Sequence, residues 1–198
     1  SSPVKALHEF VKNDATVEYL SAGNNKIFKG LSTLTDISPG GGYVISGNDW
    51  MFSNLNNHVT LVQRGKEPLI YHDPGGGYVL VKMTTHPSYV APTASITWSD
   101  VKAGISALGR TWVATDQVVY FSDLKQSQKW NGGTSGSLTV TDVWPDGTDI
   151  ITGLAVHNGF LIIFGSRSIL VYANAAIPAN LSLQDTIVGV GCISQQTI

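Results

Sequence analysis

The chain has 198 residues, of which 42% are hydrophobic and only 13% are charged, and its formal net charge is −2 at pH 7. The charged fraction is about half of the roughly 25% that is usual in soluble domains, so we expect partners to bury part of the surface. The slightly acidic balance argues against tight nucleic-acid binding through phosphates. A single cysteine, Cys192, excludes an internal disulfide and a thiolate zinc site.

The first fourteen residues predict a short helix or a linker. Ser2 suits an N-cap, Pro3 suits the first helical position, and Leu7 and Val11 fall roughly on one helical face. No apolar run is long enough to span a bilayer, so we expect no membrane-spanning segment. The chain begins without Met and ends inside a repeating pattern, which indicates a piece of a longer protein.

Residues 15–198 have the pattern of a β-structure that repeats a hairpin. Each hairpin is a strand, a polar turn and a second strand that ends in an aromatic residue. The hairpins lie near residues 16–30, 57–71, 109–121 and 158–172. Their closing aromatics, Phe28, Tyr71, Tyr120 and Tyr172, are 43, 49 and 52 residues apart. A period of about 40–50 residues is typical of propeller blades, so we predict an all-β chain that forms a β-propeller or a propeller fragment.

The apolar runs within these strands support stacked sheets. The segments "FLIIF" and "ILVY" within 160–172 are apolar at consecutive positions, which indicates strands buried on both faces. A two-layer β-sandwich would leave one face of each sheet in water and would show alternation, although it stays the main competing fold.

The hexapeptide Pro-Gly-Gly-Gly-Tyr-Val occurs twice, beginning at Pro39 and at Pro74. A phosphate-binding loop would need a helix N-terminus behind the glycines and usually a Lys-Ser/Thr pair, and both are missing. We therefore predict that both copies are turns that precede strands.

One group of carboxylates is a candidate metal or acid–base site. The stretch "TDVWPDGTD" places Asp142, Asp146 and Asp149 within eight residues. Clustered carboxylates can hold Ca²⁺ or serve as the acid and base of a propeller hydrolase. The same stretch contains the turn signal "PDG" and lacks the EF-hand spacing, so we favour a turn and keep the three aspartates as weak candidate ligands.

Two tryptophans are candidates for a contact surface. Trp130 and Trp144 lie in loops rich in Gly and Asp, where exposed indoles could bind a partner or a sugar.

The segment Ser122–Lys125 matches the Ser-x-x-Lys pattern of serine acyltransferases, but it follows a strand and has no companion motif. His72 and His86 could approach each other in space, but a surface or hydrogen-bonded role is favoured for each. We expect no catalytic residues and no cofactor.

The second half of the chain resembles a family of viral tail proteins. The runs "GRTWVATDQVVYFSDLKQSQKWNGG", "VWPDGTDIITGLAVHNGFLIIFGSRSILVYANA" and "LQDTIVGVGCIS" resemble the nozzle, or tail tubular protein B, group of short-tailed bacteriophages and the related packaged-DNA stabilisation (stopper) proteins. The resemblance covers about Leu108–Ser194 and extends more loosely back through "NNHVTLVQRGKEPLIYHD".

The resemblance implies a structural virion protein without catalytic residues. Its members form a homo-oligomeric ring, a hexamer in that group, below the portal and adaptor and in contact with tail-fibre proteins. The ring surrounds the channel that retains and ejects double-stranded DNA, without sequence-specific binding. The alternatives are a propeller-type glycoside hydrolase that uses the Asp142–Asp149 cluster, or a carbohydrate-binding module on the tail that uses exposed tryptophans.

Overall fold

The chain folds into four antiparallel sheets, each built from four strands that are consecutive in sequence. The computed structural model describes residues 3–45, 47, 49–145 and 147–198. The first sheet contains β1 (Val4–Val11), β2 (Val17–Gly23), β3 (Lys26–Lys29) and β4 (Thr35–Asp36). The second contains β5 (Trp50–Leu55), β6 (His58–Gln63), β7 (Leu69–His72) and β8 (Val79–Lys82).

The second half of the chain repeats this plan. The third sheet contains β9 (Ala103–Ala107), β10 (Arg110–Ala114), β11 (Val118–Phe121) and β12 (Gly136–Thr139). The fourth contains β13 (Ile151–His157), β14 (Phe160–Gly165), β15 (Ser168–Ala173) and β16 (Ser182–Val188). The helices of the described residues are four 3₁₀ turns: η1 (Met83–Thr85), η2 (Trp98–Asp100), η3 (Pro178–Asn180) and η4 (Gln195–Thr197).

Local sequence explains the tight turns inside the sheets. The two turn residues between β13 and β14 are Asn158 and Gly159, and both have positive φ. The pairs Asn24–Asn25 and Asn56–Asn57 have the same backbone signs between β2 and β3 and between β5 and β6. Two successive positive φ values match the twist of a hairpin, and Asn and Gly adopt them with the least strain. The turns therefore set the strand register from a few residues.

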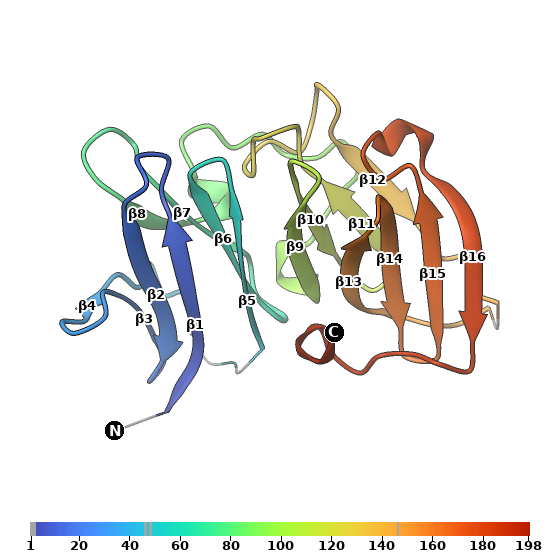
Figure 1. The fold of residues 1–198 in the computed structure, drawn as a ribbon, viewed down its shortest axis with the longest axis horizontal. Helices are drawn as coiled ribbons and strands as arrows, with labels where there is room; N and C mark the ends of the chain where they lie inside the picture. The colour runs from blue at the N-terminus through green and yellow to red at the C-terminus, as the bar shows by residue number, and fades with distance from the viewer. Residues whose placement is uncertain (1–2, 46, 48, 146) are drawn as a thin grey trace.

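The four sheets stand side by side and fan out from their first strands (Figure 1). β1 packs on β5, β5 on β9, and β9 on β13, while the later strands of each sheet lie farther out. The row of sheets does not close on itself in the part of the chain that the structure describes. The prediction of an all-β chain is confirmed, and four adjacent sheets replace the two layers of a sandwich.

A separate apolar cluster fills each space between neighbouring sheets. Phe10 and Leu20 of the first sheet meet Tyr71 of the second, and Val62 of the second meets Val113 of the third. The largest cluster joins the third and fourth sheets around Trp112, which has no exposed surface. The central hairpins of the four sheets are the four repeats expected from sequence.

The predicted N-terminal helix is wrong, because residues 4–11 form strand β1, which pairs with β2 along its whole length. Alternate side chains, including His8 and Phe10, pack against Phe52 and Tyr71 of the second sheet. That burial outweighs weak local helix signals, since contact with another sheet is absent from any local pattern. Residues 3–14 are thus part of the first sheet. None of the helices among the described residues is long and apolar enough to cross a membrane.

Candidate functional sites at the sheet ends and loops

Asp149 anchors the loop that connects the third sheet to the fourth. Its carboxylate accepts hydrogen bonds from the backbone N–H groups of Ile150 (2.8 Å), Ser166 (2.9 Å) and Arg167 (2.9 Å), and from the Ser166 hydroxyl. The side chain is 6% exposed. Burial raises the pKa of Asp149, but the hydrogen bonds from Ser166 and Arg167 outweigh it, so the pKa lies below its usual value. The carboxylate is therefore ionised and already saturated with donors.

Of the three candidate aspartates, only Asp142 and Asp149 lie in the described part of the chain, where they belong to no three-residue group that could hold a metal ion. Asp142 is exposed in the turn after β12, Asp149 is engaged as above, and Asp146 lies outside the described residues. Among the described residues, no group of three His, Cys, Asp or Glu side chains is arranged to hold a metal ion. The Asp149 carboxylate holds its own turn through these hydrogen bonds. Its buried position is therefore explained without a bound ligand.

The predicted contact surface at Trp130 and Trp144 is wrong, because both indoles are buried, at 1% and 4% exposed. Trp130 stacks edge-on against Trp98 with ring centroids 5.2 Å apart, and its Nε1 donates to the sulfur of Met83. Trp144 donates from Nε1 to Oε1 of Gln117 at 3.0 Å. The loops that carry the two tryptophans fold back over the sheets, so these side chains belong to the core.

The second Pro-Gly-Gly-Gly loop surrounds a carboxylate of its own chain. Oδ1 of Asp73 accepts hydrogen bonds from the backbone N–H groups of Gly75 (2.7 Å), Gly76 (3.1 Å) and Gly77 (3.0 Å). Successive N–H groups that converge in this way form an anion-binding nest. Asp73 occupies the nest, which supports the interpretation of the loop as a turn.

The Ser-x-x-Lys segment has no free nucleophile. Ser122 is fully buried, and its hydroxyl accepts from the backbone N–H of Thr111 and donates to the carbonyl of Asp123. Lys125 has a φ of 58° and its N–H donates to the carbonyl of Gly109. A nucleophilic serine needs a base within hydrogen-bond reach, and this hydroxyl is bound to the backbone instead.

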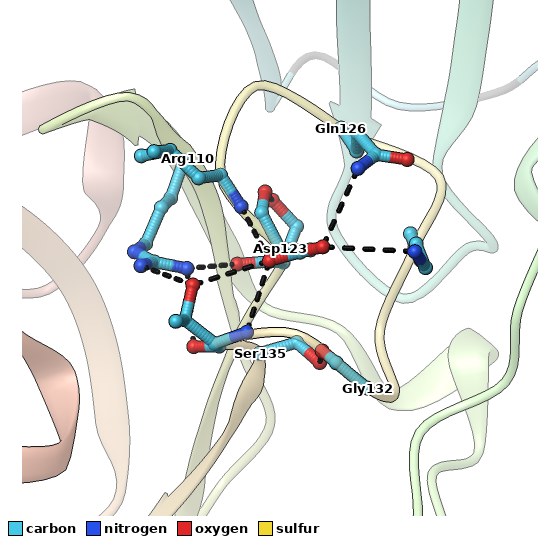
Figure 2. Close-up of polar contacts among 9 residues, drawn as sticks. Arg110, Asp123, Gln126, Gly132 and Ser135 are labelled. Atoms are coloured by element: carbon cyan, nitrogen blue, oxygen red, sulfur yellow. Dashed lines mark hydrogen bonds and ion pairs between the residues drawn. The ribbon is translucent and has the colours of Figure 1, made fainter.

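A buried polar node that the sequence analysis missed lies at the end of the third sheet (Figure 2). Arg110, 3% exposed at the start of β10, donates from Nη1 to the carbonyls of Ser122 (2.8 Å) and Thr134 (3.1 Å). Its Nη2 donates to the Thr134 hydroxyl at 2.6 Å, and that hydroxyl donates to Oδ1 of Asp123 at 3.1 Å. Thr134 thus connects a buried cation to a buried anion.

Asp123 organises the long loop between β11 and β12 (Figure 2). It accepts from the N–H groups of Leu124 (2.9 Å) and Thr134 (3.0 Å), from the Gln126 amide, and it pairs with Lys129 at 3.7 Å. The backbone hydrogen bond from Thr134 is the main cause that holds the pKa of Asp123 below its usual value. The hydrogen bonds of this node join separate parts of the same loop. The node therefore supports the loop structurally.

Arg110 and Thr134 also line a cavity of about 360 Å³ between the third and fourth sheets. Residues 176–179, from the connection between β15 and β16, form its other wall. Burial lowers the pKa of Arg110, while the Asp123 carboxylate acts in the opposite direction. The cavity has a cation at its edge, and the two Nη atoms of Arg110 donate to loop oxygens, while its buried Nε has no partner among the described residues.

Three imidazoles gather where the second sheet meets the loop of the third. The ring centroid of His72 lies 4.1 Å from that of His86 and 5.9 Å from that of His58. Buried ring nitrogens of all three, and Oε1 of Gln128, have no partner among the described residues. These groups share a hollow of about 320 Å³. The sequence left open whether His72 and His86 approach each other and favoured a surface or hydrogen-bonded role, whereas the structure brings the two rings together in a buried cluster.

The histidine cluster is held in its neutral form. Burial is the main cause that lowers the pKa of all three rings, to about 4 for His86. The backbone N–H of Ser88 donates to Nδ1 of His86, so the neutral ring carries its proton on Nε2, which has no partner among the described residues. A nitrogen that carries a proton cannot bind a cation, so this tautomer does not suit a metal ligand.

Comparisons with known proteins give a likeness of fold alone. No family model and no curated protein matches the chain. Among solved structures, a chain from the S. cerevisiae complex of a Dbp5 variant with Nup159, a Gle1 variant, IP6 and ADP is similar to it, with a TM-score of 0.51 and 7% sequence identity. The match covers 84% of this chain and 44% of that chain, so this chain spans less than half of its length.

Proposed function

We propose that the chain is a segment of a β-propeller. Four consecutive four-stranded meanders that fan out from their first strands are the units from which propellers are built. The spacing of the repeats, with each sheet packed face to face on the next, supports the same interpretation. A closed ring would need additional sheets beyond these four.

We further propose that this segment belongs to a structural subunit of the tail nozzle ring of a short-tailed bacteriophage. The observation that carries the proposal is the fourth sheet. Its central strands, β14 and β15, consist of the run "FLIIFGSRSILVYA" that bears the resemblance, and one of their faces is apolar without another sheet against it. An uncovered apolar face of this kind is typical of a subunit that assembles with a partner.

In this proposal the protein is located in the virion and acts as part of a conduit. The subunits form a homo-oligomeric ring, six-fold in the related group, next to the portal and adaptor and to the tail-fibre proteins. The 12 Lys and Arg residues are balanced by 14 Asp and Glu residues. Few phosphate contacts form on such a surface, so double-stranded DNA can slide past it without sequence-specific binding.

The hydrolase and sugar-binding alternatives have little support among the described residues. A hydrolase needs two carboxylates that flank a substrate, and the buried carboxylate of Asp149 is already bound by its own loop. A sugar platform at Trp130 or Trp144 needs an exposed ring, and both rings are buried.

The test is assembly of the full-length protein with its adaptor partner. Light scattering would measure the mass, and negative-stain imaging would show whether a ring with a channel of duplex width forms. A ring that forms or becomes more stable with the adaptor supports the nozzle proposal. A compact monomer that ignores the adaptor contradicts it.

A further inference from the structure

The cavity of about 360 Å³ between the third and fourth sheets combines apolar walls with one ionisable side chain, that of Arg110. The apolar part of its lining comes from β11 and from the connection between β15 and β16: Phe121, Ala176, Ile177, Pro178 and Ala179. Ile177 is 60% exposed, and Thr134 is exposed as well, so solvent reaches the cavity at this edge. Mostly apolar walls with a few polar groups in one place are typical of small-molecule sites.

Arg110 forms the polar end of the cavity, and part of its guanidinium is uncommitted. Of the five N–H groups, the two on Nη1 donate to the carbonyls of Ser122 and Thr134, and one on Nη2 donates to the Thr134 hydroxyl (Figure 2). The two bonds to Thr134 occupy the edge between Nη1 and Nη2. The remaining edge carries the N–H of Nε and the second N–H of Nη2, and the buried Nε has no partner among the described residues.

The charges next to this free edge leave a positive excess. Asp123 is connected to Arg110 through the Thr134 hydroxyl, and it also pairs with Lys129 at 3.7 Å, so one carboxylate balances two cations. Both oxygens of Asp123 accept hydrogen bonds from its own loop, and Asp123 is not part of the cavity lining. A buried guanidinium without a carboxylate in direct contact favours an anion beside it.

We propose that this cavity binds a small monocarboxylate with an apolar body. The edge formed by Nε and Nη2 is a fork of two parallel N–H groups, which matches the two oxygens of a carboxylate. The apolar walls receive the rest of the molecule and exclude water from the ion pair. The site lies within one chain, so this inference is independent of the propeller and tail-nozzle proposals.

The size of the cavity suits a ring or a short chain better than a simple inorganic anion. An apolar cavity of about 150 Å³ is large enough for benzene. A cavity of about 360 Å³ therefore has room for an aromatic ring that carries a carboxylate. Inorganic phosphate would occupy the polar end alone and would leave the apolar walls uncovered.

Titration of the whole chain with benzoate tests the proposal. The chain has three arginines, so the Nε–H signal of Arg110 can be followed in two-dimensional ¹H–¹⁵N NMR and assigned by its absence from Arg110→Lys. We expect benzoate to shift this signal saturably, with a Kd below about 1 mM. Benzamide, the neutral match in shape, and inorganic phosphate should each bind at least about tenfold more weakly.

Arg110 also supports its loop, so a second pair of variants tests the site from the opposite wall. Ile177→Asp places a negative charge at an exposed position of the lining, and Ile177→Asn is its neutral match in shape. We expect benzoate to bind Ile177→Asp at least about fivefold more weakly than Ile177→Asn, and benzamide to bind both equally.

Three results would each overturn the inference. The first is an Arg110 Nε–H signal that benzoate does not shift at concentrations up to about 10 mM. The second is equal binding of benzoate and benzamide, which would remove the role of the guanidinium fork. The third is equal benzoate affinity in the two Ile177 variants, which would place the bound carboxylate away from this cavity.

Discussion

The central strands of the third and fourth sheets differ in how much of their surface other sheets cover. In β10 of the third sheet, all five residues are buried, because the second sheet covers one face and the fourth sheet covers the other. In β14 and β15 of the fourth sheet, buried residues alternate with half-buried ones. A strand that is apolar at consecutive positions has two faces suited to burial. The number of neighbouring sheets decides how many of these two faces are buried.

The largest expected effect comes from removing a side chain between two covered sheets. Trp112→Ala leaves a large cavity in the cluster between the third and fourth sheets and removes the hydrogen bond from Nε1 to the Ala107 carbonyl. We expect a loss of about 3–5 kcal/mol in the free energy of unfolding, measured by urea denaturation. Phe164→Ala, on the side of the fourth sheet opposite to Ile163, should cost about half as much or less, since its ring is only half-buried. Equal losses would remove the distinction between the two sheets.

A substitution at Asp149 tests what holds the junction between the third and fourth sheets. Asp149→Ala leaves the N–H groups of Ser166 and Arg167 and the Ser166 hydroxyl without their acceptor. We expect the unfolding free energy to fall by about 1–3 kcal/mol. Asp142→Ala, in the same loop but exposed, should change it by less than about 0.5 kcal/mol. A loss of the same size at Asp142 would indicate that the loop depends on something other than the Asp149 carboxylate.

The pH dependence of stability tests the histidine cluster, which lies between the second and third sheets. Burial lowers the pKa of His86 from its usual value of 6.5 to about 4, so the folded chain binds this proton less tightly than the unfolded chain. Stability should therefore be complete above about pH 6.5 and should decline as the pH falls through about 4. His86→Gln should flatten this decline in thermal unfolding, and His157→Gln, an exposed position, is the matched control. If the stability of His86→Gln falls with pH as steeply as that of the unmodified chain, the role of the cluster is contradicted.

The smallest expected effect is at Leu7, on the outer side of the first sheet. Leu7→Ala should change the unfolding free energy by less than about 0.5 kcal/mol in urea denaturation, because the side chain is 63% exposed. A large loss would mean that Leu7 supports the first sheet itself.

Features that depend on a few neighbouring residues were predictable. Hairpin turns such as Asn158–Gly159 follow from residues that accept positive φ, and the strands beside them follow from apolar runs. The four hairpins could therefore be located in the sequence. Both Pro-Gly-Gly-Gly segments were likewise recognisable as turns, and the second precedes strand β8 as predicted. The prediction of a strand directly after the first copy is wrong, because residues 43–45 are not in a strand.

Features that depend on distant partners were missed. The strand at residues 4–11 forms because Phe10 meets Tyr71, more than fifty residues away. Trp130 appeared to be a surface residue from its loop composition, yet it packs between Met83 and Trp98. The Arg110–Thr134–Asp123 node joins groups that share no recognisable spacing.

The sequence by itself determined that this protein is a row of antiparallel hairpins with apolar strands, because turn conformation and strand preference are local properties. Tertiary structure alone decided which faces are covered, which loop side chains enter the core, and which carboxylates are held by backbone N–H groups. Those outcomes depend on contacts between sheets, and the free energy of burial is set by what lies across the interface.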